Sequence, residues 1–168
     1  MGKNEEDKRR YGLYCEMIEQ LDEGCRLINE YDSIPHDYGT ATLYQAESQL
    51  IHLVGEYPGI TAVELASILK KTPSACSQLI RKLRKKEWMK QVRNEENNRE
   101  YRLYLTESGW EIFKGHNQFE QACYRRSYGS LAEFSEKDFQ TYIEIQKRLN
   151  ETFALDVEES RNITGQSE

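Results

Sequence analysis

Two helix starts in quick succession constrain this chain more than any other feature. Thr61-Ala-Val-Glu64 has the form of a capping box, in which Thr61 caps the helix and Glu64 reaches back to the cap. Thr72-Pro73 begins a second helix, because proline at the first helical position lacks only an N–H that would be unpaired there. The segment is therefore predicted to fold into two short helices joined by a tight turn.

The second of these helices is predicted to be amphipathic and to run to about Glu87. Its apolar stripe consists of Cys76, Leu79, Ile80 and Leu83. The opposite side combines short polar side chains, which can reach base edges, with Arg and Lys, which can reach phosphates. We therefore expect a recognition helix that contacts DNA through Thr72, Pro73, Ser74, Ser77, Gln78, Arg81, Lys82 and Lys85.

A polar hairpin follows. Met89–Arg93 and Tyr101–Leu105 have the composition and alternation of strands, and Thr106 then caps a long helix. Two short helices followed by a hairpin make a winged helix-turn-helix. In the wing we expect DNA contacts from Asn97, Asn98 and Arg99, with Arg99 the best candidate for the minor groove.

The distribution of charge agrees with this interpretation. The whole chain has a net charge of −6, whereas residues 70–99 contain ten basic and three acidic residues, a net +7. The rest of the chain therefore carries −13. A basic patch in an acidic protein favours local binding to a polyanion through counterion release, and the DNA duplex is the expected partner.

Amphipathic helices are predicted on both sides of this region. Their residue ranges are Glu5–Tyr31, Thr42–Tyr57, Glu107–Tyr128 and a last helix that opens at Ser135 and frays after Asp156. The fold class is mainly α with a small β-wing. Two terminal helices with surplus apolar surface on a small domain favour a homodimer. The predicted organisation is a dimerisation helix and loop (1–37), a winged domain (38–109), a connecting helix and a second dimerisation helix (110–157), and a flexible acidic tail (158–168).

Composition limits the cellular location that we expect for this protein. The hydrophobic fraction is 38%, and no apolar run approaches the length of a membrane span. The four cysteines include no Cys-x-x-Cys pair, which argues against a disulfide framework. We expect a cytoplasmic protein that does not associate with a membrane.

The order of these motifs resembles the MarR family of bacterial winged-helix regulators. The resemblance rests on Thr-x-x-Glu-Leu-Ala at Thr61–Ala66, on Ser77–Leu83 and on Leu-Thr-Glu-Ser-Gly at Leu105–Gly109, with weaker signals at Asp37–Thr40 and Glu47. It implies a ligand-responsive homodimeric repressor that binds a palindromic operator. Two departures stand out: the wing has Asn97-Asn98-Arg99 where the family usually has Asp before paired arginines, and Glu87 stands where the family usually has glycine.

The resemblance also suggests sensory residues. The family binds small aromatic anions between the dimer arms and the winged domain, which points to Tyr14, Tyr38, Tyr44 and Trp110, although ordinary packing roles are favoured for them. Cys15 is the candidate redox residue, with a structural role again favoured. A zinc-sensing branch carries His and Glu on helices, and this chain has two i, i+4 pairs, His52–Glu56 and His116–Glu120. Because histidine is scarce, we predict no metal site and no cofactor.

Two other functions remain open. The departures in the wing allow a winged module that docks on another regulator, and the fold also allows a thiol- or metal-responsive regulator. An enzyme is not expected, since the chain shows no Gly-rich phosphate loop, nucleophile elbow or clustered acid–base pair.

Overall fold

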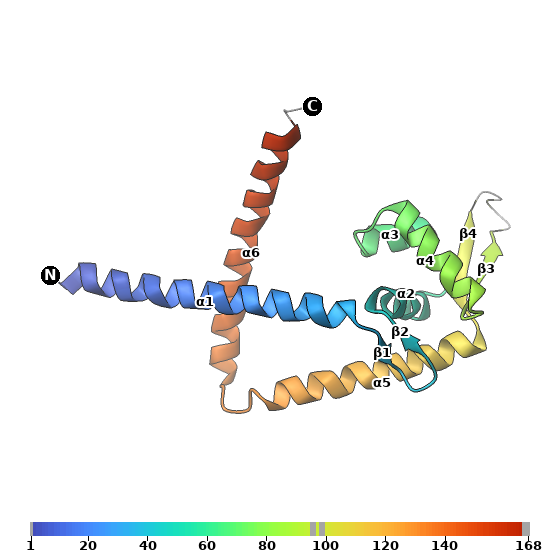
Figure 1. Cartoon of the computed structure of the whole chain (residues 1–168), viewed down its shortest axis with the longest axis horizontal. Helices are drawn as coiled ribbons and strands as arrows, with labels where there is room; N and C mark the ends of the chain where they lie inside the picture. The colour runs from blue at the N-terminus through green and yellow to red at the C-terminus, as the bar shows by residue number, and fades with distance from the viewer. Residues whose placement is uncertain (1, 95–96, 98–99, 166–168) are drawn as a thin grey trace. The chain divides into compact units, whose positions relative to one another are not determined.

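A computed structural model describes residues 2–94, 97 and 100–165, and the chain divides into two compact units, Met1–Gln121 and Ala122–Glu168. Figure 1 follows the elements along the chain. They are α1 (Gly2–Ser33), β1 (His36–Asp37), β2 (Thr42–Leu43), α2 (Gln45–Glu56), α3 (Ala62–Ile68), α4 (Pro73–Lys85), β3 (Met89–Arg93), β4 (Tyr101–Leu105), α5 (Glu107–Gly129) and α6 (Glu136–Gly165).

The predicted fold class is confirmed: the protein is mainly helical with a winged helix-turn-helix domain. Strands β3 and β4 have the predicted bounds and pair antiparallel, with Met89 opposite Leu105. The chain just before α3 also pairs with β4. Gly59 N–H donates to the carbonyl of Leu103 at 2.8 Å. The wing is thereby fixed to the start of the helix-turn-helix.

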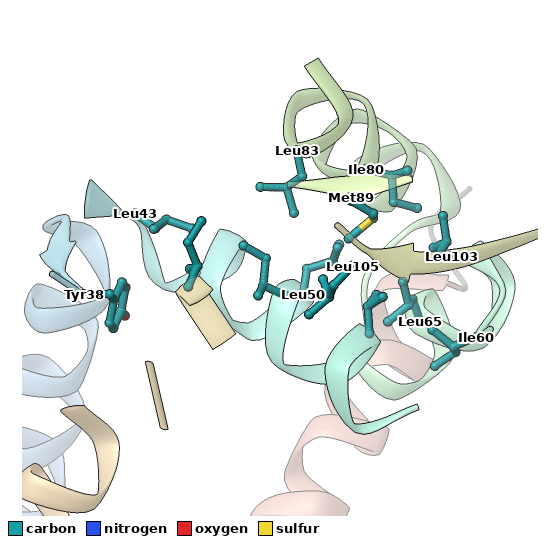
Figure 2. Packing of buried hydrophobic residues seen from close by; sticks show 13 residues of the cluster. Tyr38, Leu43, Leu50, Ile60, Leu65, Ile80, Leu83, Met89, Leu103 and Leu105 are labelled. Carbon is teal, nitrogen blue, oxygen red and sulfur yellow. The ribbon is translucent and has the colours of Figure 1, made fainter. Parts of the chain in front are cut away.

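The core of the first unit lies where α2, α3, α4 and the hairpin meet. Figure 2 shows Leu50 of α2, Leu83 of α4 and Leu105 of β4 in this packing. These three side chains are at most 5% exposed. Burial of each such side chain contributes about 1.5–3 kcal/mol, so the core orients α4 through its apolar stripe.

The helix starts predicted from capping patterns are present. Thr61 and Thr72 each accept a hydrogen bond from the backbone N–H three residues on, and Thr106 does the same for Gly109. Ser135 and Asp138 form a reciprocal cap at the start of α6. These caps satisfy backbone donors that a helix start leaves unpaired.

Both helices of the helix-turn-helix end in the same way. Lys70 (φ 50°) and Glu87 (φ 60°) occupy the left-handed region, which residues other than glycine rarely adopt. After Glu87, the N–H of Trp88 returns to the carbonyl of Leu83 at 3.1 Å. This Schellman arrangement ends α4 at Lys85, slightly before the predicted end near Glu87.

Two local predictions are wrong. The stretch before the second helix is not simply loop, because β1 and β2 form a small antiparallel pair and α2 begins only at Gln45. The last helix does not fray after Asp156 but continues to Gly165, so the tail assigned to 158–168 is helical over 158–165. That stretch contains no proline and no glycine before Gly165, and propensity therefore allows the helix to continue.

The terminal helices leave much apolar surface exposed. On α1 the exposed apolar residues are Tyr11, Leu13, Tyr14, Leu27, Ile28 and Tyr31, and on α6 they are Tyr142, Ile143, Ile145, Phe153, Leu155, Val157 and Ile163. None of the helices among the described residues combines the length and the apolarity needed to cross a membrane.

Candidate nucleic-acid interface

Helix α4 divides into the two faces that its sequence predicted. Cys76, Ile80 and Leu83 are buried in the core. The residues predicted to contact DNA are all exposed: Thr72, Pro73, Ser74, Ser77, Gln78, Arg81, Lys82 and Lys85. The polar face is therefore available to a partner along the whole length of the helix.

A cationic cleft lies between α4 and β3. It is lined by Arg81, Arg84, Lys85, Met89, Lys90 and Gln91. Arg84 donates to the amide oxygen of Gln91 at 2.7 Å, which fixes this guanidinium against the strand. Four basic residues around one cleft create a local positive potential of the kind that attracts phosphate. Sequence reasoning did not place Arg84 or Lys90 in the interface, because their position depends on how the hairpin packs against the helix.

Lys82 has a different environment from Arg81 and Lys85. Its ammonium lies 3.1 Å from a carboxylate oxygen of Glu47, and Lys86 reaches the same oxygen at 3.1 Å. The Glu47 side chain is only 3% exposed, and its second oxygen accepts the backbone N–H of Tyr44 at the start of α2. Lys86 also lies over the ring of Trp88, 4.3 Å from its centroid. Glu47 thus connects α2 to α4 through two lysines.

The ionised state of Glu47 favours this connection. Burial alone would raise its pKa, but the hydrogen bonds from the Tyr44 N–H, Lys82 and Lys86 outweigh burial and hold the pKa below the ordinary value of 4.5. The carboxylate is therefore ionised at neutral pH, and the charge of Lys82 is partly balanced within the protein.

The described part of the wing is its base, where the hairpin leaves β3 and enters β4. Asn94 N–H donates to the carbonyl of Glu100 at 2.9 Å, and Glu100 N–H donates to the carbonyl of Asn97 at the same distance. Asn97 is exposed, as its predicted role requires. Asn98 and Arg99, the other two predicted wing contacts, lie outside the described residues.

The four residues of the expected effector pocket have different surroundings. Tyr38 is buried beside His116 and Phe119, whereas Tyr14 lies next to Tyr11 on α1 and is 43% exposed. Tyr44 caps α2 and is half exposed, with Lys82 5.8 Å from its ring centre.

Trp110, the fourth of them, packs edge-on against Phe113 in α5. Cys15 is half-buried, and like the other three cysteines it is a free thiol.

The histidines are arranged in a way that sequence spacing alone did not predict. His52 of α2 and the pair His116 and Glu120 of α5 form one cluster, with a donor atom of each within 4.8 Å of the others. Glu56, the i, i+4 partner of His52, is exposed on α2. Helical periodicity predicted each pair separately but could not show that α2 and α5 bring His52 to the second pair.

A capped helix-turn-helix, a hairpin wing and an exposed polar and basic face on the second helix define a winged-helix domain. The MarR family model ("MarR family") matches residues 43–101. These residues lie in the winged domain, so it is the winged domain that resembles the MarR family.

Solved structures share the fold. A zinc-responsive MarR family member, Lactococcus lactis ZitR, is 17% identical with a TM-score of 0.71, covering 84% of this chain and 99% of that chain. Streptococcus pneumoniae FabT in complex with DNA is 20% identical with a TM-score of 0.63, covering 88% and 99%. ZitR in complex with DNA is also 20% identical, with a TM-score of 0.68, covering 81% and 97%. A search of curated proteins found no match.

Proposed function

We propose that this protein is a DNA-binding transcriptional regulator that acts as a homodimer on a palindromic operator and represses transcription until a ligand lowers its affinity for DNA. The observation that carries the proposal is the exposed polar and basic face of α4, on a helix whose other face is anchored in the core. The solved complexes of FabT and ZitR with DNA support it, because both proteins share this fold.

The residues of α4 would divide the work. Ser77 and Gln78 lie toward the start of the helix and carry the short polar groups that read base edges. Arg81 and Lys85 lie further along and would bind phosphates. Each protomer would place one recognition helix in a major groove, and the two half-sites would lie about one turn of DNA apart.

Dimerisation would use the exposed apolar residues of α1 and α6 described above. Side chains such as Leu13, Ile28 and Leu155 are at least half exposed in the single chain. A second copy would remove this surface from water symmetrically. Sedimentation equilibrium of the purified protein at micromolar concentration tests this part, and a monomer would contradict it.

A titration with labelled DNA tests the main proposal. The probe is the region upstream of the protein's own gene, and the readout is fluorescence anisotropy at several salt concentrations. Arg81→Ala should weaken binding to all sequences and flatten the salt dependence, whereas Gln78→Ala should mainly reduce the preference for the operator over random DNA. Lys137→Ala, an exposed lysine in the first turn of α6, is the control and should bind like the wild type. Binding that is insensitive to salt or equal in all variants would contradict the proposal.

A module that docks on another regulator is the second candidate. A groove beside the wing favours it, since Tyr57, Val63, Ile68 and Tyr101 line it and are 45–73% exposed. A defined complex with another regulator that forms without DNA, and that Val63→Asp abolishes, would support this function over DNA binding.

A further inference from the structure

A buried carboxylate is paired with a cation on the exposed face of α4. Glu47 belongs to the first turn of α2, and its side chain is only 3% exposed. One of its oxygens, Oε1, lies 3.1 Å from the ammonium of Lys82 and 3.1 Å from that of Lys86. The Lys82 side chain is 51% exposed, on the face that we expect to meet DNA. A buried anion is thus joined to a cation of the recognition helix.

Helix α2 holds this carboxylate in place independently of the lysines. Its other oxygen, Oε2, accepts the backbone N–H of Tyr44 at 3.1 Å, as the third residue of a capping box. Leu50 and Ile51, one turn further along the same helix, are fully buried in the core. We therefore expect the anion to stay beside α4 when DNA binds.

The two edges of the polar face of α4 differ in charge balance. The ammonium of Lys82 is paired with Glu47 and lies 5.8 Å from the centre of the Tyr44 ring, so this lysine is turned toward α2. Arg81 and Lys85 line the cleft between α4 and β3, where the charged lining residues that the structure describes are all cations. A neighbouring anion therefore accompanies Lys82 but not the cations of the cleft.

Such an anion lowers what a lysine can contribute to DNA binding. A cation strengthens binding when it neutralises a phosphate and releases the counterions condensed there. A phosphate that approaches Lys82 also approaches Glu47, which is ionised at neutral pH, so repulsion between like charges offsets part of the attraction. The ion pair thus weakens the contact between Lys82 and the DNA backbone without removing Lys82 from the helix.

We propose that Glu47 is a positioning residue that withholds Lys82 from DNA phosphates and thereby limits the part of the DNA affinity that does not depend on sequence. Phosphate contacts hold a protein on any duplex, whereas base contacts distinguish one sequence from another. The inference rests on the proposed function, since it concerns the recognition helix of a DNA-binding protein. Glu47 acts through Lys82 and does not itself touch DNA.

Lys86 provides an internal comparison. It reaches the same carboxylate oxygen at the same 3.1 Å, but it is the C-cap of α4, and its ammonium lies 4.3 Å from the centre of the Trp88 ring. This ring contact does not depend on Glu47, so Lys86 should remain against the protein when the carboxylate charge is lost. Loss of that charge should therefore release Lys82 toward DNA, and not both lysines.

The test measures binding of the full-length protein to a short duplex of random sequence, by fluorescence anisotropy at several salt concentrations. Glu47→Gln keeps an acceptor for the Tyr44 N–H but loses the charge. This variant should bind more tightly than the wild type at low salt, and the slope of log K against log salt should steepen by up to about 1.8 for a dimer. Its advantage should then shrink by up to roughly twelvefold when the salt concentration rises about fourfold. A merely structural role of Glu47 would weaken binding and would not steepen the slope.

Two double variants and a charge control identify the cation. Glu47→Gln with Lys82→Ala should return close to the wild-type slope, whereas Glu47→Gln with Lys86→Ala should keep the steeper slope. Glu56→Gln removes one negative charge from the exposed last turn of α2 and should bind like the wild type. The proposal is overturned if the slope of Glu47→Gln is no steeper than that of the wild type, if Glu56→Gln steepens it equally, or if the steeper slope requires Lys86 and not Lys82.

A measurement on the wild type keeps the proposal testable if Glu47→Gln does not fold. Acylation of lysine amines, followed by mass spectrometry, reports how far DNA covers each of them. Saturating random DNA should slow the acylation of Lys85 more than that of Lys82, and equal protection would overturn the proposal. A wild type without salt-dependent binding to any duplex contradicts the proposed function itself, whereas wild-type binding with an unchanged slope in Glu47→Gln contradicts only this inference.

Discussion

The carboxylate of Glu47 on α2 lies 3.1 Å from the ammonium of Lys82 on α4, although Lys82 projects from the helix face that we expect to meet DNA. Lys82, one of the cations of the recognition helix, is therefore engaged in an ion pair within the protein. Lys86 shares the same carboxylate, so the position of α4 depends on a polar connection as well as on the apolar core.

The first prediction separates the charge of Glu47 from its capping role. Glu47→Gln keeps a side chain that can accept the Tyr44 N–H but loses the ion pairs, and it should lower the free energy of unfolding by about 1 kcal/mol, since both lysines are partly exposed. Glu47→Ala also loses the cap and should cost about 1 kcal/mol more. Urea unfolding at pH 7 measures both, and equal stability of the two variants would contradict the capping role.

The second prediction concerns pH. Because the pKa of Glu47 is lowered in the folded protein, its contribution to stability is fully present above the unfolded value near 4.5 and is lost as the pH falls through the folded value. The difference in unfolding free energy between the wild type and Glu47→Gln should therefore be constant from pH 7 to about 5.5 and shrink below 4.5. Urea unfolding across this range measures it. A difference that grows on acidification would show that the pKa of Glu47 is raised, not lowered, in the folded protein.

The third prediction compares two lysines of α4. Lys85 is exposed in the cleft between α4 and β3, whereas Lys82 is paired with Glu47. If Lys85 contacts one phosphate, a dimer of Lys85→Ala should lose about 1.8 from the slope of log K against log salt, because each contact contributes about 0.9. Lys82→Ala should change the slope by less, since its charge is already partly balanced by Glu47. Anisotropy titrations at several salt concentrations measure this, and a larger effect for Lys82 would mean that DNA displaces Glu47.

The fourth prediction uses the left-handed residue after α4. Glu87→Gly should stabilise the protein by about 1 kcal/mol, because glycine adopts φ 60° without the steric cost that glutamate bears. The control is Lys85→Gly, two residues earlier and still helical, which should destabilise by about 1 kcal/mol. Thermal unfolding of both variants would show opposite shifts in melting temperature. Shifts in the same direction would contradict the Schellman arrangement.

Much of the fold could be predicted from the sequence, because its signals are local. The caps at Thr61 and Thr72 and the alternation in β4 each act within a few residues. The structure has both caps, and the alternation holds at Leu103 and Leu105, which are buried, whereas Tyr101 is exposed. Helix ends were harder to place. Glu87 carries no sign of its left-handed backbone in its side chain, and α6 continues past Asp156 because no residue before Gly165 stops it.

The candidate sites show a clearer limit. Periodicity placed Lys82 on the outer face of its helix correctly, yet it could not show that α2 brings Glu47 to the same place. It also paired His52 with Glu56, whereas the structure groups His52 with His116 and Glu120. Contacts of this kind depend on which helix faces meet, and this is decided by the packing of side chains that are far apart in the chain.

A single hydroxyl group joins the end of α4 to the start of α5. Thr106 Oγ1 donates to the carbonyl of Glu87 at 2.6 Å and accepts the N–H of Gly109 at 3.1 Å, and a Cβ on Gly109 would strike the carbonyl of Trp88. These close contacts hold the first turn of α5 against the residues that follow α4. We therefore expect a tilt of α5 at this junction to shift the C-terminal end of α4 with it.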